Sequence, residues 1–327
     1  MPLISIIIPF YNVEQYVAEC LDSVFEQNLP EAAYEVICVN DASTDGSRDI
    51  VASYLSKHAN MQIIDHSRNL FLGSARNTGV RAAKGKYIWH VDSDDWIAPN
   101  CLKQIVDICE SKRLDVLEFG YIGANDLPIS IGEPPRTTDV VSGQEYVKRY
   151  YLSNFGAICP IWRRVYRREF LEANKIVSPP INMGEDEPYA VNVFVTANRV
   201  SFEPKDWYFH RINNQSLVGE SMKNWNAQKW YNSSIVCAKH VSVVYQKLKR
   251  EMPSDIRRAA KNMVIYDILY FQKYESIMSE DAKNGFWKLC RRNFIVNLYV
   301  FRYLNRRKAY CYVRNVLANR SNKQKSS

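Results

Sequence analysis

The first hundred residues alternate short apolar segments with segments whose apolar positions recur at helical spacing. The β-branched run at 4–8 is typical of a strand buried on both faces, and Pro9 ends it. Residues 13–24 then place an apolar side chain every three or four positions, which predicts a helix. This order predicts an α/β fold with a mostly parallel central sheet covered by helices.

Polar side chains follow the predicted strands. Further strands are expected at 34–40, 61–65 and 87–91, and further helices at about 50–55 and 74–83. Tyr11 and Asn12 come after the first strand, Asp41 after the second, and residues 92–95 after the strand at 87–91. The carboxyl ends of parallel strands form the ligand crevice of open α/β sheets, so these side chains are expected to lie together.

The pattern loosens beyond residue 100, where helices are predicted at 99–112, 142–152 and 164–174. In the stretch WRRVYRREF, Trp162, Tyr166 and Phe170 recur every four residues and predict a buried helix face. The arginines between them are expected to form a solvated face, or one that attracts a phosphate-bearing acceptor: Arg163, Arg164, Arg167 and Arg168.

Charge is concentrated at one end of a chain whose formal net charge is +8. Residues 282–327 contain twelve Lys or Arg and no acidic residue, leaving 31 basic against 35 acidic residues elsewhere. We expect a helical, basic and aromatic region at 221–318 and a disordered tail at 319–327. The basic region fits either an anionic membrane surface or packing on the main domain, and no nucleic-acid partner is expected.

The eight cysteines are scattered without a C-x-x-C pair, which predicts small buried side chains in a reducing compartment. No basic leader precedes the first apolar run, and no charge-free stretch of about 18 apolar residues occurs. We therefore expect a cytoplasmic protein, with any membrane association peripheral at the inner face of the cell membrane.

The segment WHVDSDDW carries the strongest chemical signal. Asp92 and Asp94 flank Ser93, with Asp95 adjacent, and carboxylates so close repel one another. A hard divalent cation that also binds diphosphate oxygens is one remedy, and an acidic turn before a helix is the alternative.

At these residues the chain resembles glycosyltransferase family 2, whose members have the GT-A fold, a Rossmann-like architecture. The resemblance extends over 3–217 through SIIIPFYNVEQYVAECLDSVFEQ, EVICVNDASTDGS, GSARNTGVRAAKGKYIWHVDSDDW and GEDEPY, in that order. It implies a GT-A domain at 1–220, with a nucleotide-sugar-binding half at 1–98 and an acceptor half at 99–220.

The resemblance also implies roles for individual residues. Mg²⁺ or Mn²⁺ is expected on Asp92 and Asp94, with Ser93 near the donor. The nucleotide is expected near Pro9, Tyr11, Asp41 and Arg76. His210, as a metal ligand, and Arg211, at the diphosphate, are candidates in the segment WYFHRINNQSLVG; both also suit structural roles.

The Asp of the E-D pair in GEDEPY, Asp186, corresponds to the family's general base. A hydroxyl is a poor nucleophile at neutral pH, so a carboxylate must take its proton. One base and no second nucleophile imply a single displacement with inversion. The resemblance implies transfer of a sugar from a nucleoside-diphosphate sugar, with a UDP-sugar as the expected donor. The expected acceptor is a glycan or lipid-linked hydroxyl in cell-surface polysaccharide assembly.

Two other functions compete with this interpretation. A non-catalytic member would bind a nucleotide-sugar or glycan as an assembly partner, but Asp92, Asp94 and Asp186 are all present. A Rossmann-type oxidoreductase would need G-x-G-x-x-G after the first strand, where IIIPFYN stands instead.

Overall fold

The computed structural model describes residues 1–123, 138–150, 160–181 and 185–211. The predicted helical region at 221–318 and the predicted tail at 319–327 lie outside these ranges. Within them, no helix is both long and apolar enough to cross a bilayer.

One mixed sheet of eight strands organises the described part of the chain, in the order β3-β2-β1-β4-β7-β6-β8-β5. Its strands are β1 (Ile4–Phe10), β2 (Tyr34–Asn40), β3 (Met61–Asp65), β4 (Tyr87–His90), β5 (Trp96–Ile97), β6 (Val116–Gly123), β7 (Arg164–Arg167) and β8 (Val200–His210). The first four pair in parallel, which confirms the strands predicted in the first hundred residues. Beyond β4 the sheet turns mixed, because β7 runs antiparallel to both β4 and β6.

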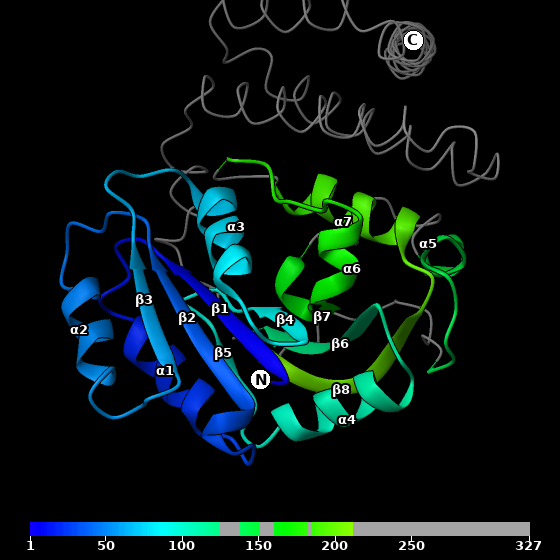
Figure 1. Ribbon diagram of the computed structural model, residues 1–327, viewed down its shortest axis with the longest axis horizontal. Helices are drawn as coiled ribbons and strands as arrows, with labels where there is room; N and C mark the ends of the chain where they lie inside the picture. Colours follow the sequence, from blue (N-terminus) through cyan, green and yellow to red (C-terminus); the bar gives the residue numbers. More distant parts are fainter. Residues whose placement is uncertain (124–137, 151–159, 182–184, 212–327) are drawn as a thin grey trace, which may run out of the picture.

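Helices cover both faces of this sheet (Figure 1). They are α1 (Val17–Phe25), α2 (Ser47–Tyr54), α3 (Leu72–Ala82), α4 (Leu102–Ser111), α5 (Gly143–Tyr150), α6 (Arg168–Ala173) and α7 (Asp186–Thr196), with 3-10 turns at Glu31–Ala33 and Ile161–Arg163. Helices α1, α2 and α4 pack into one apolar cluster, and α3, α5, α6 and α7 into the other. The expected α/β architecture is therefore present.

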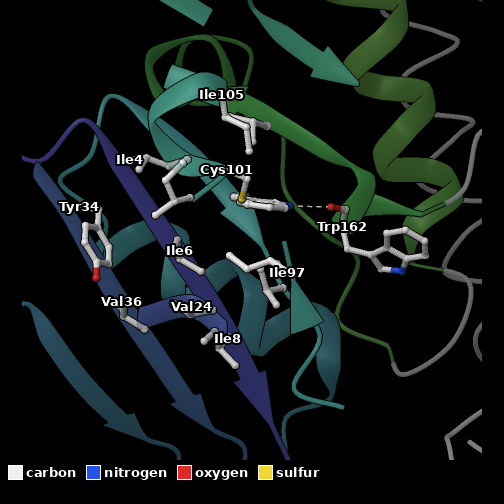
Figure 2. Packing of buried hydrophobic residues seen from close by; sticks show 14 of the residues in the cluster. Ile4, Ile6, Ile8, Val24, Tyr34, Val36, Ile97, Cys101, Ile105 and Trp162 are labelled. Atoms are coloured by element: carbon white, nitrogen blue, oxygen red, sulfur yellow. Dashed lines mark hydrogen bonds between the residues drawn. The ribbon is translucent and has the colours of Figure 1, made fainter. Parts of the chain in front are cut away.

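Strand β1 supplies both clusters because its side chains alternate between the faces. Ile4, Ile6 and Ile8 belong to the cluster with α1 and α4, whereas Ile7 belongs to the cluster with α3. Figure 2 shows the first cluster, in which the indole N–H of Trp89 donates to the carbonyl of Trp162 at 2.7 Å. A strand buried on both faces thus joins the two layers.

Two glycines allow α3 to approach its neighbours closely. A Cβ at Gly79 would lie 2.3 Å from a methyl carbon of Ile7, and one at Gly73 would lie 1.7 Å from the carbonyl oxygen of Pro179. Neither distance is possible for a larger residue without movement of the backbone. Arg76 lies on α3 between these two contacts, so its position is fixed from both sides.

The helix predicted at 164–174 is wrong over its first four residues. Residues 164–167 form strand β7, and only the part from Arg168 onward is helical. Alternation within β7 places Val165 in one apolar cluster and Tyr166 in the other. Trp162, on the 3-10 turn before β7, belongs to the cluster of Val165, and Phe170, on α6, belongs to that of Tyr166. The fourfold spacing imitated a helix, while pairing with β4 and β6 selected the strand.

The solvated arginine face is also wrong for the first two arginines. Arg163 and Arg164 are buried, and Arg164 Nε donates to the buried carboxylate of Glu118 at 2.7 Å. Arg163 Nη2 lies 3.5 Å from the other oxygen of Glu118. The partner stands 46 residues away in the sequence, which local spacing does not reveal.

The predicted burial of the cysteines holds for the four in the described ranges. Cys20, Cys38, Cys101 and Cys109 are buried and free. Burial raises the pKa of Cys101 to about 12, so its thiol stays protonated at neutral pH.

We expect Glu118→Gln to destabilise the protein by about 3 kcal/mol or more, because two buried guanidinium groups lose their compensating charge. Glu169→Gln is the matched control, since its side chain is 82% exposed where it pairs with Arg167, and it should cost less than about 1 kcal/mol. Urea unfolding of the two variants checks this. Equal losses would contradict the buried role of Glu118.

Candidate active site

Three neighbouring strands deliver polar residues to one edge of the sheet. Tyr11 follows β1, Asp41 follows β2 and Asp92 follows β4, and β1 lies between the other two. The ring of Tyr11 is 42% exposed, whereas Asp41 is buried. Pro9 is buried within β1, one position before its last residue. The edge expected from the sequence therefore exists, with one exposed aromatic ring and one buried carboxylate.

Arg76 joins carboxylates from two distant parts of the chain. Its Nη2 donates to Asp92 Oδ1 at 2.7 Å, and its Nη1 donates to Asp186 Oδ1 at 2.9 Å and to Glu185 Oε1 at 2.5 Å. The guanidinium is only 1% exposed. The D-x-D segment and the E-D pair, which the sequence left unconnected, are thus in contact with one cation.

One guanidinium cannot balance three carboxylates, so Glu185, which is buried, and its neighbour Asp186, which is partly exposed, share a proton. Burial raises the pKa of Glu185 well above its usual range, and the charge of Asp186 raises it further. Burial also raises the pKa of Asp186, an effect that Arg76 partly offsets. We assign the shared proton to Glu185, which leaves Asp186 as an ionised partner of Arg76.

The three aspartates after β4 have different environments. Asp92 is bound to Arg76, while Asp95 is buried and accepts from the Tyr208 hydroxyl at 2.6 Å and from the Arg211 backbone N–H at 2.8 Å. Within the described ranges, no side chain donates a hydrogen bond to the carboxylate of Asp94. Ser93 is buried between them. Among these three aspartates, Asp94 is therefore the one without a side-chain hydrogen-bond donor in the described part of the chain.

His210 and Arg211, at the end of β8, lie against this acidic turn. His210 Nδ1 is 3.3 Å from Asp95 Oδ1, and its ring stacks on Trp162 with centroids 5.3 Å apart. Burial lowers the pKa of His210, but the hydrogen bond and charge of Asp95 outweigh that effect and raise it. Its Nε2 is the nitrogen left for a metal.

Arg211 fastens the acidic turn to α1. Its Nε donates to the Asp94 carbonyl at 2.9 Å, and its Nη2 pairs with Glu19. The guanidinium carbon lies 4.7 Å from the centre of the Trp96 ring. In this arrangement Arg211 supports the turn and keeps a positive charge beside it.

The donor set at Asp92 and Asp94 fits a hard divalent cation. Such ions take carboxylate oxygens and complete their coordination with water or phosphate oxygens. Arg76 engages Oδ1 of Asp92, and no described residue donates to Oδ2. Across the described residues, no three His, Cys, Asp or Glu side chains come together as a ready-made metal cage. A cation here would therefore depend on ligand oxygens as well as on protein.

His66 is a site residue that the sequence analysis missed. Its Nδ1 lies 2.7 Å from Asp41 Oδ1, and both side chains are buried. The available signal was its position, because His66 directly follows β3 as Asp41 follows β2. The rule that strand ends converge would have included it.

Comparisons with known proteins agree with this geometry. The sequence model of glycosyl transferase family 2 matches residues 5–173. The uncharacterized glycosyltransferase EpsJ of Bacillus subtilis is 34% identical over 249 residues, covering 73% of this chain and 71% of that protein. The poly(ribitol-phosphate) beta-glucosyltransferase of Bacillus spizizenii is 31% identical over 211 residues; the match covers 64% of this chain but only 32% of that protein.

Solved structures show the same fold. S. aureus TarS 1-349 in complex with UDP-GlcNAc has a TM-score of 0.67 at 23% identity, covering 90% of this chain and 81% of that one. The mannosyltransferase PcManGT from Pyrobaculum calidifontis, in complex with GDP-Man and Mn²⁺, has a TM-score of 0.52 at 16% identity, covering 93% and 87%. Both resemblances support the α/β fold.

The backbone at Phe71 is strained, and this yields a stability prediction. Its φ of 73° and ψ of 157° lie in a region that essentially only glycine adopts. We expect Phe71→Gly to be about 1 kcal/mol more stable than Phe71→Ala, because only glycine removes the strain while both lose the ring. Thermal unfolding of the two variants checks this.

Leu55 provides the control for Phe71, since it is similarly exposed but has a helical φ of −58°. There the order should reverse, with Leu55→Gly less stable than Leu55→Ala. The same order at both positions would contradict strain at Phe71.

The acidic turn predicts a pH-dependent stability. Burial, and then the charges of Asp95 and Asp92, raise the pKa of Asp94 from 3.8 to about 7. A carboxyl group with a raised folded-state pKa stabilises fully below pH 3.8 and loses that contribution as the pH rises through 7. With chelator present, Asp94→Asn should therefore gain stability over wild type as the pH rises, by at most about 4 kcal/mol.

Urea unfolding midpoints at pH 4.5, 6 and 8 test the Asp94 prediction. Asp107→Asn, at an exposed position on α4, is the matched control and should show no such trend. A difference between Asp94→Asn and wild type that stays constant with pH would show that folding does not raise this pKa.

Proposed function

Because the chain belongs to glycosyl transferase family 2, we propose that it transfers a sugar from a uridine diphosphate donor to an acceptor hydroxyl, with inversion at the anomeric carbon. The observation that supports this most is the contact of Arg76 with both Asp92 and Asp186. Asp92, which would hold a cation on the donor's diphosphate, and Asp186, which would accept a hydroxyl proton, then share one guanidinium.

Asp41 and Tyr11 suit the donor's base. A carboxylate accepts a hydrogen bond from a ring N–H, and an exposed aromatic ring stacks on the face of a base. Asp92 and Asp94, with His210 Nε2 as a further candidate, would hold Mg²⁺ or Mn²⁺, which would supply positive charge to a departing diphosphate. Arg211 adds a fixed positive charge beside the turn.

Asp186 acts as the general base in this proposal. It takes the proton of the acceptor hydroxyl as the acceptor oxygen bonds to the anomeric carbon and the bond to the diphosphate oxygen breaks. Burial favours this role, because a raised pKa makes a carboxylate a better base. Arg76 holds the carboxylate in one orientation, and its own charge persists throughout.

The relatives support a surface-polysaccharide or cell-wall acceptor. One is named a poly(ribitol-phosphate) beta-glucosyltransferase, and TarS is named a poly(ribitol-phosphate) beta-N-acetylglucosaminyltransferase. TarS bound to UDP-GlcNAc supports the uridine donor, and PcManGT bound to GDP-Man and Mn²⁺ supports the cation. A glycan or lipid-linked acceptor therefore belongs to the proposal. An anionic membrane surface stays a prediction for the basic region outside the described residues.

A panel of uridine and guanosine diphosphate sugars, with Mn²⁺ or with chelator, tests this function by release of nucleoside diphosphate. Turnover of one donor should require the cation and should fall about 10²- to 10⁴-fold in Asp186→Asn, the usual contribution of a general base. Asp107→Asn serves as the matched control and should keep wild-type turnover.

Binding separates the possible failures. Calorimetric binding of the donor to Asp186→Asn should match wild type, because the base does not hold the nucleotide. Wild-type turnover in Asp186→Asn would remove this residue from catalysis. Donor binding without turnover by wild type, even with acceptor glycans supplied, would favour a non-catalytic assembly role.

A further inference from the structure

A chain of hydrogen bonds runs from the exposed side of α3 to the carboxylate of Asp41. Arg81 Nη2 donates to Thr78 Oγ1 at 2.8 Å, Thr78 Oγ1 lies 3.0 Å from His66 Nε2, and His66 Nδ1 lies 2.7 Å from Asp41 Oδ1. The side chains of His66 and Asp41 are 8% and 5% exposed. The chain is thus buried at its Asp41 end.

The partners of His66 determine its tautomer. A carboxylate oxygen only accepts, so Nδ1 carries the proton. Thr78 Oγ1 already accepts from Arg81, which leaves its hydroxyl hydrogen for Nε2. We therefore assign a proton to Nδ1, and each hydrogen bond in the chain then has one donor and one acceptor.

The two oxygens of Asp41 are consequently unlike. Oδ1 accepts from His66 Nδ1 and from the backbone N–H of Leu70, at 2.7 and 2.8 Å. The described residues donate no hydrogen bond to Oδ2. Protein groups saturate one oxygen and fix the plane of the carboxylate, so the other oxygen is the one presented to a ligand.

We propose that His66 is a specificity-determining positioning residue, which holds Asp41 so that Oδ2 selects a nucleobase with a ring N–H. Uracil presents N3–H to such an oxygen, whereas cytosine presents a lone pair at its N3 and is repelled. His66 acts through Asp41 and does not itself contact the donor. This inference rests on the proposed function, because it assigns a determinant of donor choice at the same site.

Two amide substitutions separate positioning from packing. The amide of His66→Asn reaches the place of Nδ1 and keeps a donor for Asp41, whereas the amide of His66→Gln reaches the place of Nε2 and keeps only the link to Thr78. Removal of a hydrogen bond to a charged group lowers binding affinity by about tenfold or more. UDP should therefore bind His66→Asn nearly as tightly as wild type, and His66→Gln at least about tenfold more weakly.

Calorimetry with UDP and CDP in the presence of Mn²⁺ measures both affinity and selectivity. Wild type and His66→Asn should prefer UDP, and His66→Gln should lose most of that preference. In turnover, the effect should fall on KM for the donor, with kcat nearly unchanged. Equal weakening by both substitutions, or undiminished UDP preference in His66→Gln, would overturn the proposal.

The tautomer gives a test that needs no variant. Long-range ¹H–¹⁵N spectra of the wild-type imidazoles should show His66 protonated on Nδ1. Protonation on Nε2 alone would overturn the proposal, because His66 would then have no hydrogen for Asp41. If wild type binds no uridine or guanosine nucleotide while His66 shows the expected tautomer, the proposed function fails and the positioning of Asp41 stands.

Discussion

The burial of the Arg76 guanidinium is the constraint on which the site depends. A buried cation needs close anionic partners, and Arg76 has them in Asp92, Asp186 and Glu185. Asp92 follows a strand of the parallel half of the sheet, and the two acids of the E-D pair lie at the start of α7. Holding one guanidinium between them fixes the distance between Asp92 and the E-D pair.

The fold provides the rigidity that this arrangement requires. Helix α3 is pressed against β1 at Gly79 and against the Pro179 backbone at Gly73, so the Cα of Arg76 has little freedom. On the other side, β8 brings Tyr208 to the carboxylate of Asp95. Buried hydrogen-bonded groups such as Asp95 rigidify the turn, whereas Asp94 receives no side-chain hydrogen bond from the described residues.

The acidic residues of the site differ in their roles because their surroundings differ. Asp41 is oriented by a ring N–H and a backbone N–H and presents one oxygen, Asp92 and Asp186 share a cation, and Asp95 is enclosed by structural donors. Identical side chains thus acquire different chemical roles through hydrogen bonding and burial. Phe71 is strained and follows Leu70, whose backbone N–H donates to Asp41. The fold therefore accepts a local free-energy cost in the backbone beside this edge of the sheet.

The sequence by itself determined the four parallel strands, because a β-branched run buried on both faces and a polar residue after each strand are local signals. It also determined that Tyr11, Asp41 and Asp92 share one edge, because parallel strands end together. Only the tertiary structure decided that Arg76 binds Asp92 and Asp186, that Glu118 compensates Arg164, and that 164–167 is a strand. Those outcomes depend on partners from 16 to 110 residues away, and a charge in the sequence does not specify its partner.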